Sequence, residues 1–519
     1  MNVRDVLVKT AMQFPDKELL MSPEKRYTGR QVIERAFRIS NALLDLGLEK
    51  GDKVAVLLTN SHQSVECFCG IMSAGMARVP LNMRNSAGEH LFMLNDSEAK
   101  AVMVGEEYTK VIDSVLPEAK TVKHAICVTG PSPGSMLSYE ELITKASPEE
   151  PDVEIRDEDI HRLSYTSGTT GQPKGVIQDN RSEMVSLFNA LIDGLNIQTS
   201  DVVALTSPVT HASGAMILPH FIRGAKVVIL PGFDPKTLLQ IIEKERVTTL
   251  YLVPTTIVML LNEPDLDKYD TSTIRTIRYG ASPIAPEVLK KAIEVFGNVF
   301  VQGYGLTEAN MPLTLLTKED HIMDGSEKKL NRLSSVGREV TMAKVRIMGE
   351  DGNFLPPGET GEIVVQSDQI MREYWKNPEA TTEAFRGGWL HTRDVGLMDE
   401  DGYVFLVDRK DDMIVSGGFN VYPKEVENVL YMHPAVLEAA VFGVPHEKWG
   451  ETVKAAVSLK KGMTVTEEEI IQFCKERVAS YKKPTSVDFI DELPKNPNGK
   501  ILRKDLKEPY WRGKGRKIN

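Results

Sequence analysis

The sequence has few cysteines, and their placement argues against two common kinds of site. Only four occur among 519 residues, namely Cys67, Cys69, Cys127 and Cys474. Their spacing matches neither a metal-ligand motif nor a disulfide framework, which is typical of free thiols in a reducing compartment. We therefore expect a cytoplasmic protein that has no cysteine-bound metal.

The sequence also lacks an excess of positive charge and any long uncharged apolar run. Its formal net charge is −11, whereas a chain that binds nucleic acid normally needs a basic surface for the phosphates. Residues 1–20 carry charges throughout and lack the apolar core of a signal peptide, and no later segment predicts a membrane helix. We expect neither a nucleic-acid partner nor an integral membrane segment, which leaves a peripheral membrane association open.

The composition and patterning that are present predict a multidomain α/β protein. Hydrophobic residues make up 41% and charged residues 26% of the chain, and 519 residues exceed what one hydrophobic core holds. Residues 52–82 predict a strand, a helix and a strand in turn, and residues 225–305 repeat this alternation. The prediction is largely parallel sheets covered by helices.

The pattern changes in the last third of the chain. Residues 336–367 hold short alternating apolar runs separated by Asp-Gly, Pro-Pro-Gly and Thr-Gly turn signals, which predict a small antiparallel β subdomain. A further α+β pattern follows from about Asp411, and the basic end from residue 511 is typical of a solvated tail. We predict a large N-terminal domain, residues 1–410, and a small α+β C-terminal domain, residues 411–519.

A loop rich in glycine and hydroxyl residues lies between two strand-like runs, in YTSGTTGQPKGV from Tyr165 to Val176. Glycines let the backbone approach a ligand closely, and backbone NH groups, hydroxyls and a lysine together suit phosphate. The side chains that would contact phosphate are Thr166, Ser167, Thr169, Thr170 and Lys174. The segment differs from the GxxxxGK[ST] phosphate loop, and taken alone it could be a flexible surface turn.

Six further segments follow in order: SPVTHASG (207–214), YGASP (279–283), QGYGLTE (302–308), HTRDVG (391–396), DRKDDMIVSGGFNVYPKEVE (408–427) and PKNPNGKILRKDL (494–506). With the loop, they resemble the signatures of the superfamily that contains acyl-CoA synthetases, the adenylation domains of peptide synthetases and firefly-type luciferases. The resemblance spans most of the chain beyond residue 160. It implies an enzyme that uses ATP to activate a carboxylic acid as an acyl-adenylate.

The resemblance implies a nucleotide site built from several of these segments. Thr307 would bond phosphate and Glu308 would hold Mg²⁺, both as catalytic residues. Tyr304 would stack on adenine opposite the backbone of residues 280–282, and Asp394 would accept hydrogen bonds from the ribose hydroxyls. The set that would bind ATP and AMP is Thr166, Ser167, Gly168, Thr169, Thr170, Gly171, Lys174, Gly280, Ala281, Ser282, Gly303, Tyr304, Gly305, Asp394 and Arg409.

Each of these residues also has a plain structural interpretation. Glu308 could be a charge at a helix N-terminus, and Tyr304 could be a core residue. Asp394 and Arg409 could be surface ion-pair partners.

The acid substrate is expected near His211, where the resemblance implies a catalytic gate between the acyl pocket and the thiol tunnel; a lone histidine there could also be structural. Amino-acid-activating relatives place an aspartate in this region to pair with the substrate ammonium, and VTHASGAM contains no acid. We therefore expect an apolar acid of the medium-length fatty or aryl type, because no tryptophan in the pocket segments shortens the cavity. The predicted pocket wall consists of Phe188, Ala212, Met216 and Met311, together with Gly303 and Gly305.

The resemblance also assigns roles in the C-terminal domain. Lys500, in PKNPNGK, would be a catalytic point charge beside the α-phosphate, although an arbitrary lysine near a chain end is usually solvated. Asp411 would be the hinge about which this mobile domain turns. Gly417 and Gly418 would line the pantetheine tunnel, and Trp449 would contact the nucleotide of coenzyme A or serve packing.

Together these assignments predict a ligase that needs ATP, Mg²⁺ and coenzyme A, acts on a small carboxylic acid, and could form a homodimer. Three alternatives stay open at this point. The acyl group could pass to the phosphopantetheine of a carrier protein, the adenylate could be oxidised as in a luciferase, or the chain could be a catalytically inactive nucleotide-binding regulator. Glu308, Asp394 and Lys500 occurring together argue against the last.

Overall fold

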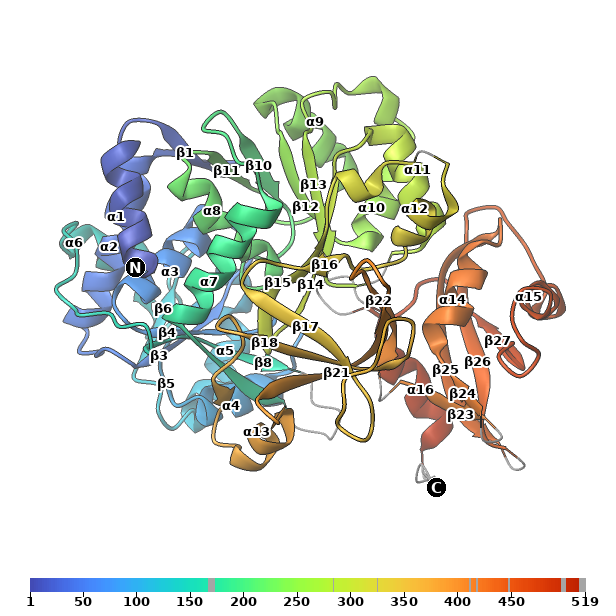
Figure 1. The fold of residues 1–519 in the computed structure, drawn as a ribbon. Helices are drawn as coiled ribbons and strands as arrows, with labels where there is room; N and C mark the ends of the chain where they lie inside the picture. Colours follow the sequence, from blue (N-terminus) through green and yellow to red (C-terminus); the bar gives the residue numbers. More distant parts are fainter. Residues whose placement is uncertain are drawn as a thin grey trace.

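The structure, a computed structural model, describes the chain except residues 167–172, 283, 324, 410–411, 417–418, 447–448, 496–500 and 513–519, and the side chains of Arg409 and Asn420. The described residues form four sheets. Three lie in a large N-terminal part, and the fourth lies in a separate C-terminal part at one end of the molecule (Figure 1). The predicted α/β class, with a large and a small part, is confirmed.

The largest sheet has nine strands. In spatial order they are β16 (Arg338–Glu339), β15 (Ala309–Leu316), β14 (Phe300–Leu306), β13 (Thr276–Gly280), β12 (Thr249–Leu252), β10 (Val202–Leu205), β11 (Lys226–Ile229), β1 (Glu18–Met21) and β2 (Arg26–Thr28). The strands from β14 to β1 are parallel, as the strand-helix alternation predicts. The edge strands β2 and β15 pair antiparallel with β1 and β14, and β16 pairs antiparallel with β15.

The two faces of this sheet pack in different cores. One face packs against α9 (Pro235–Glu245), α10 (Pro254–Leu261) and α11 (Pro286–Phe296), near α12 (Glu327–Arg332). The other packs against α1 (Val3–Gln13), α2 (Gly29–Asp45), α3 (His62–Ser73), α7 (Asn180–Asn189) and α8 (Ile217–Ile222). Along β13, Ile277 and Tyr279 belong to the first core, so Arg278 between them lies on the second face.

The second sheet has eight strands. In order they are β19 (Glu373–Tyr374), β9 (Lys174–Asp179), β8 (Ile160–Thr166), β4 (Ala77–Pro80), β3 (Lys53–Leu57), β5 (Ala99–Val104), β6 (His124–Cys127) and β7 (Leu137–Ser138). Its further helices are α4 (Ala87–Asp96), α5 (Thr109–Val115) and α6 (Tyr139–Lys145). Because β8 and β9 are antiparallel and adjacent, the predicted phosphate loop joins the two arms of a hairpin.

The third sheet is the predicted antiparallel β subdomain. Its strands are β17 (Ala343–Met348), β18 (Gly361–Ser367), β21 (Trp389–Met398), β20 (Phe385–Arg386) and β22 (Val404–Arg409), with α13 (Pro378–Ala384) beside them. Two strands of the same stretch of chain leave it: β16 pairs with β15 and β19 pairs with β9. The subdomain is therefore tied to both large sheets.

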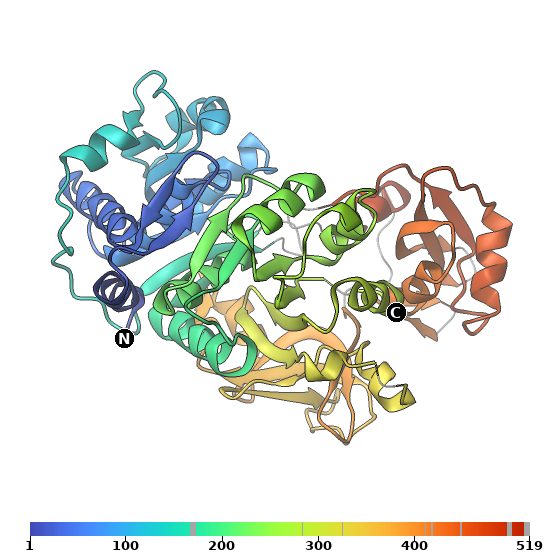
Figure 2. The ribbon, with the colours of Figure 1, turned by 90° about the horizontal axis from the view of Figure 1, so that it is seen from above.

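The C-terminal part has its own core. Its sheet contains β24 (Phe419–Val421), β23 (Ile414–Ser416), β26 (Gly450–Leu459), β25 (Val436–His446) and β27 (Ser486–Phe489), packed with α14 (Pro423–Tyr431) and α15 (Glu467–Lys475), while α16 (Arg503–Trp511) lies along β25. Seen from above, it forms its own lobe at one end of the molecule (Figure 2). Among the described residues, no helix has the length and apolarity that crossing a bilayer demands.

Candidate active site

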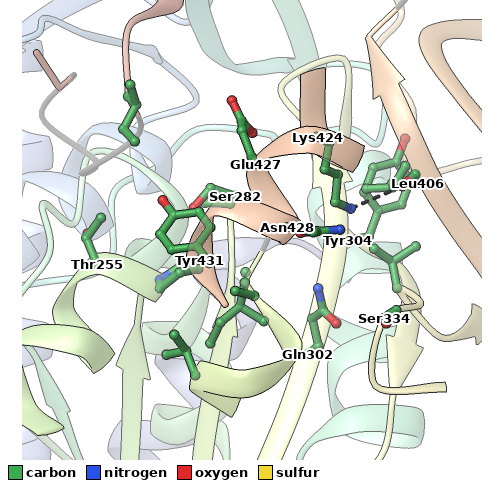
Figure 3. A pocket seen from close by; sticks show the side chains of 18 of the residues that line it. Thr255, Ser282, Gln302, Tyr304, Ser334, Leu406, Lys424, Glu427, Asn428 and Tyr431 are labelled. Carbon is green, nitrogen blue, oxygen red and sulfur yellow. Dashed lines mark hydrogen bonds between the residues drawn. The ribbon is translucent and has the colours of Figure 1, made fainter. Parts of the chain in front are cut away.

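A cavity lies where the two parts of the chain meet. The larger part lines it with the ends of β13 and β14, with residues 333–336 and with Asp394 of β21, and the smaller part lines it with α14 and the start of α16. In Figure 3, Lys424, Glu427, Asn428 and Tyr431 come from α14 and surround a space that Gln302, Tyr304 and Ser334 border from the other side. The predicted nucleotide residues that line it are Gly280, Ala281, Ser282, Gly303, Tyr304, Gly305 and Asp394.

The end of β13 has a backbone that only small residues allow. A Cβ atom on Gly280 would lie 2.4 Å from the carbonyl oxygen of Gly303, so a side chain there would push the two strands apart. Ala281 follows with φ +65°, a conformation that costs L-residues energy. The result is a side-chain-poor surface on which a flat ring can lie against the backbone.

Tyr304 and Asp394 are joined across two sheets. The Tyr304 hydroxyl donates a 2.6 Å hydrogen bond to Oδ2 of Asp394, and the two residues are 8% and 6% exposed. Asp394 of β21 also lies opposite Arg409 of β22 in the ladder. The bond fixes an aromatic ring and a carboxylate relative to each other within the cavity wall.

Thr307 and Glu308 form the two-residue turn between β14 and β15, because Leu306 pairs with Ala309. The helix N-terminus considered for Glu308 from the sequence is therefore wrong. Oε1 of Glu308 accepts a 2.9 Å hydrogen bond from the Tyr374 hydroxyl. Nζ of Lys174, at the base of the predicted phosphate loop, lies 5.3 Å from the centre of the Tyr374 ring. Glu308 of the turn and Lys174 at the base of the loop thus both lie next to Tyr374.

The single carboxylate at this turn suits a metal ion whose other ligands come from a bound nucleotide. In the part of the chain that the structure describes, no group of three or more His, Cys, Asp or Glu side chains could hold a metal ion. Oε2 of Glu308 has no hydrogen-bond partner among those residues. A hard cation held by this one carboxylate would need oxygen atoms from a nucleotide, which is how Mg²⁺ usually binds beside phosphates.

The predicted acyl-pocket residues all belong to or border one large core cluster. Phe188, Ala212 and Met311 pack against the core cluster that contains Met216. Next to them, His211 precedes the short helix η4 (Ala212–Met216), with its Nδ1 3.0 Å from Oγ1 of Thr210. Burial, with a smaller contribution from the Arg162 charge, lowers the pKa of His211 to about 4, so the ring is neutral at physiological pH.

The C-terminal wall contains charged residues that the sequence reasoning missed. Nζ of Lys424 donates a 3.1 Å hydrogen bond to the carbonyl of Leu406, and burial lowers the pKa of Lys424 to about 8 despite the nearby carboxylates of Asp408 and Glu427. Arg503 forms ion pairs of 2.6 Å with Glu427 and 3.1 Å with Asp412. These residues lie within the matched motifs, but only the contact between the two parts of the chain reveals that they face the cavity.

Several predicted residues lie outside the described residues: Ser167, Gly168, Thr169, Thr170, Gly171, Asp411, Gly417, Gly418 and Lys500, as does the side chain of Arg409. Ile501, which follows Lys500, lines the cavity. Trp449 does not; it is 43% exposed and stacks on His446 at 4.5 Å. Its neighbour Gly450 pairs with Ser416, the residue before Gly417.

Comparison with known proteins agrees with this geometry. The family model described as "AMP-binding enzyme" matches residues 7–375, and the model described as "AMP-binding enzyme C-terminal domain" matches residues 425–500. The chain belongs to the AMP-binding enzyme family. The long-chain-fatty-acid–CoA ligase FadD13 from Mycobacterium tuberculosis is 36% identical to this chain, over 94% of each of the two sequences. The fatty acid–[acyl-carrier-protein] ligase ScoC from Streptomyces coeruleorubidus is 34% identical over 98% of this chain and 96% of its own.

Solved structures in the comparison are also adenylate-forming enzymes. The anthranilate CoA ligase AuaEII, in complex with anthranoyl-AMP, superimposes with a TM-score of 0.90 at 29% identity and covers 98% of this chain and 97% of its own. The family and the fold predicted from the motifs are therefore confirmed, whereas the role of each site residue stays a prediction.

Proposed function

We propose that the protein is an ATP-dependent carboxylic acid:CoA ligase, which forms an acyl-adenylate and then an acyl-CoA thioester. The observation that carries the proposal is the cavity, because nucleotide residues predicted from three separate motifs line it together: Gly280 to Ser282, Gly303 to Gly305, and Asp394. The fatty-acid–CoA ligase among the relatives supports the same reaction class.

In the first step, a carboxylate oxygen of the acid attacks the α-phosphorus of ATP and the bond to pyrophosphate breaks. Tyr304 and the backbone of residues 280–282 hold adenine between them, and Asp394 accepts the ribose hydroxyls. Thr307, Lys174 and the loop from Thr166 to Gly171 bind phosphate. Lys500 places positive charge where negative charge grows.

When bound by Glu308 and the phosphates, Mg²⁺ would neutralise phosphate charge. Glu308 suits this role because the Tyr374 hydroxyl holds Oε1 of its carboxylate, while Oε2 has no partner among the described residues. No side chain has to act as a covalent nucleophile, because the acyl-adenylate already carries AMP as its leaving group.

In the second step, the thiolate sulfur of coenzyme A attacks the acyl carbon and AMP leaves. We propose that residues 411–519 turn about Asp411, which withdraws Lys500 and brings Gly417, Gly418 and Trp449 toward the pantetheine and nucleotide of coenzyme A. The neutral ring of His211 stands between the acyl pocket and the entering thiol. His211 would not need to be protonated, because AMP leaves as an anion and takes no proton from the ring.

The acid occupies the space near Phe188, Ala212, Met216 and Met311, which is consistent with a fatty or aryl chain. A second acceptor is favoured by one observation: the relative ScoC is named as a ligase for acyl-carrier protein. Transfer to the phosphopantetheine of a carrier protein uses the same adenylate and differs only in what presents the thiol.

Two assays test the proposal. ATP–pyrophosphate exchange with a panel of fatty and aryl acids should give acid-dependent label in ATP, and coenzyme A should then convert the adenylate to thioester. The absence of exchange with every acid would contradict an activating enzyme and favour a regulator. Equal concentrations of coenzyme A and holo-acyl-carrier protein, offered in competition, decide the acceptor, and exclusive carrier loading would overturn the coenzyme A assignment.

A further inference from the structure

A buried cation without a partner lies on the sheet face that the predicted acyl pocket shares. Arg278 of β13 is 2% exposed, and its Nε, Nη1 and Nη2 atoms all lack hydrogen-bond partners in the described part of the chain. Burial lowers its pKa, yet an arginine stays protonated in proteins. Because an uncompensated buried charge is strongly unfavourable, such a group calls for a ligand or another functional explanation.

Two polar neighbours of Arg278 also have atoms without partners. Tyr251 pairs with Arg278 in the parallel ladder of β12 and β13, so the two side chains share a face, and the Tyr251 hydroxyl has no partner. His220 of α8 is buried, with Nδ1 2.6 Å from the carbonyl of Met216 and no partner on Nε2. Burial lowers its pKa to about 4, a shift to which the Arg278 charge adds, so the two groups are near each other.

Glycines of β14 connect this group with the acyl pocket. A Cβ atom on Gly303 would lie 3.4 Å from Nη2 and 3.6 Å from Nε of Arg278, and a Cβ atom on Gly305 would lie 2.6 Å from Cγ of Met311. The β14–β15 ladder is irregular between Tyr304 and Leu306, so the link between the two glycines is their closeness along the strand and not strict alternation. The guanidinium therefore lies beside Gly303, which borders the nucleotide cavity, and two residues along β14 from the glycine that contacts Met311.

We infer that the acid substrate carries a second carboxylate at its far end and that Arg278 binds this group, with the Tyr251 hydroxyl as a second donor. The inference rests on the proposed function and refines its substrate: the predicted acyl-pocket side chains are apolar, whereas Arg278 on the same sheet face is buried and unpartnered, so a wholly apolar acid would leave its charge unpaired. Arginine is suited to the task because its fork of donors matches a carboxylate.

The strand geometry limits the length of the acid. Gly280, which borders the nucleotide cavity, and Arg278 are two residues apart on β13, a rise of about 7 Å. A short α,ω-diacid or an aromatic diacid spans such a separation. Arg78, a second buried arginine, lacks partners on Nε and Nη2 and lies over the Phe68 ring at 4.0 Å, whereas Arg278 has no such ring contact within the described residues.

Matched pairs of acids test the inference by ATP–pyrophosphate exchange: hexanoate with adipate, octanoate with suberate, and benzoate with terephthalate. We expect the wild-type protein to prefer the diacid in at least one pair by tenfold or more in kcat/KM. In Arg278→Met the ratio of diacid to monoacid kcat/KM should fall by thirtyfold or more, and Arg278→Lys should retain part of the preference.

Tyr279→Phe is the matched control, because Tyr279 is the next residue on β13 and its hydroxyl lies 3.0 Å from Nε2 of His321 on the opposite face. It should leave the diacid ratio unchanged. A thermal melt without ligand gives a second readout: Arg278→Met should keep or raise Tm, since it removes a buried unpaired charge.

The outcomes separate the inference from the proposed function. Exchange with monoacids alone, an ω-hydroxy acid used as well as the diacid, or an unchanged ratio in Arg278→Met would each overturn the inference and leave the ligase intact. No exchange with any acid would overturn the proposed function itself. A Tm that falls by several degrees in Arg278→Met, with the ratio unchanged, would assign the arginine a structural role.

Discussion

The two walls of the cavity are made of different kinds of groups. The larger part of the chain contributes glycine backbone and the Tyr304–Asp394 pair, which a 2.6 Å hydrogen bond holds in place. The smaller part contributes the charged side chains of Lys424, Glu427 and Arg503. The first wall therefore presents a fixed shape to a ligand. The charged side chains of the second wall would move away from the cavity if the C-terminal domain turned. This contrast predicts that losing the Tyr304–Asp394 bond of the first wall affects ATP binding, whereas losing Lys500, from the part of the chain that carries the second wall, affects one half-reaction.

The largest effect is expected for Lys500→Ala. Because the lysine should act only while the C-terminal domain faces ATP, adenylate formation should fall by about 10²- to 10³-fold, the size typical of losing one charge-stabilising donor. Thioester formation from synthetic acyl-adenylate should continue at a substantial rate. Single-turnover measurements of each half-reaction check this.

Lys504→Ala is the matched control, since Lys504 is an exposed lysine four residues further on. It should leave both half-reactions at the wild-type rate. Equal losses in both half-reactions for Lys500→Ala would mean that the lysine is structural or that the domain does not alternate.

A change at the β14–β15 turn, next to the fixed wall, should follow in size. Glu308→Gln keeps the shape of the side chain but removes its charge, so adenylation should fall by roughly 10²-fold with little change in the free energy of unfolding, because a hard cation loses an anionic ligand. The measurement is pyrophosphate exchange as a function of Mg²⁺ concentration. Glu373→Gln, an exposed glutamate beside Tyr374, serves as control, and normal turnover of Glu308→Gln at limiting Mg²⁺ would contradict the metal assignment.

Tyr304→Phe should have a smaller effect on the same wall. The ring stays and only the hydrogen bond to Asp394 is lost, so KM for ATP should rise about five- to tenfold, as expected for about 1 to 1.5 kcal/mol. Tyr403→Phe is the control, because it loses a 2.5 Å hydrogen bond to Asp320 outside the cavity. If both variants lowered Tm and neither changed KM for ATP, the Tyr304 bond would serve stability alone.

The smallest effect concerns the charged wall and pH. The pKa of Lys424 is about 8 in the folded protein and near its ordinary value of 10.5 in the unfolded chain, so the unfolded state binds more protons between these pH values. The contribution of Lys424 to stability is therefore unfavourable at neutral pH and improves as pH rises from 8 to 10.5, by at most about 3 kcal/mol.

Urea unfolding at pH 8 and pH 10 measures this contribution as the difference between the wild type and Lys424→Met. The wild type should gain about 1 to 2 kcal/mol relative to the variant over that interval. The same pH slope in both proteins would show that Lys424 is not held in a perturbed state.

Local patterns predicted most of the architecture but not its long-range pairings. The apolar runs around Val54 and Val228 became strands, because buried parallel strands leave a clear local signal. Nothing local indicates that β1 joins the largest sheet beside β11, or that β16 and β19 leave the subdomain for the large sheets. The pairings of β1 and β19 join residues about 200 positions apart, and even the pairing of β16 with β15 joins strands that belong to differently patterned segments.

The site shows the same limit. The motifs predicted Tyr304 and Asp394 as separate residues, and the structure adds that they bond to each other. Arg278 looks like an ordinary charge near the end of a strand until the core on its face of the sheet is known. Lys424 and Arg503 required the contact between the two parts of the chain, which no single segment encodes.

The β14–β15 hairpin has a consequence for altering substrate scope. One arm carries Tyr304, its turn carries Thr307 and Glu308, and its other arm carries Met311, whose Cγ crowds the space over Gly305. Residues predicted to hold the nucleotide and a residue predicted to shape the acyl space thus share a single hairpin. Enlarging the predicted pocket at Met311 risks displacing the turn at Thr307 and Glu308, whereas a side-chain change at Tyr251 of β12 leaves the hairpin itself unaltered. Directed evolution toward new acids should therefore accumulate changes around Tyr251 and Arg278 and spare the hairpin.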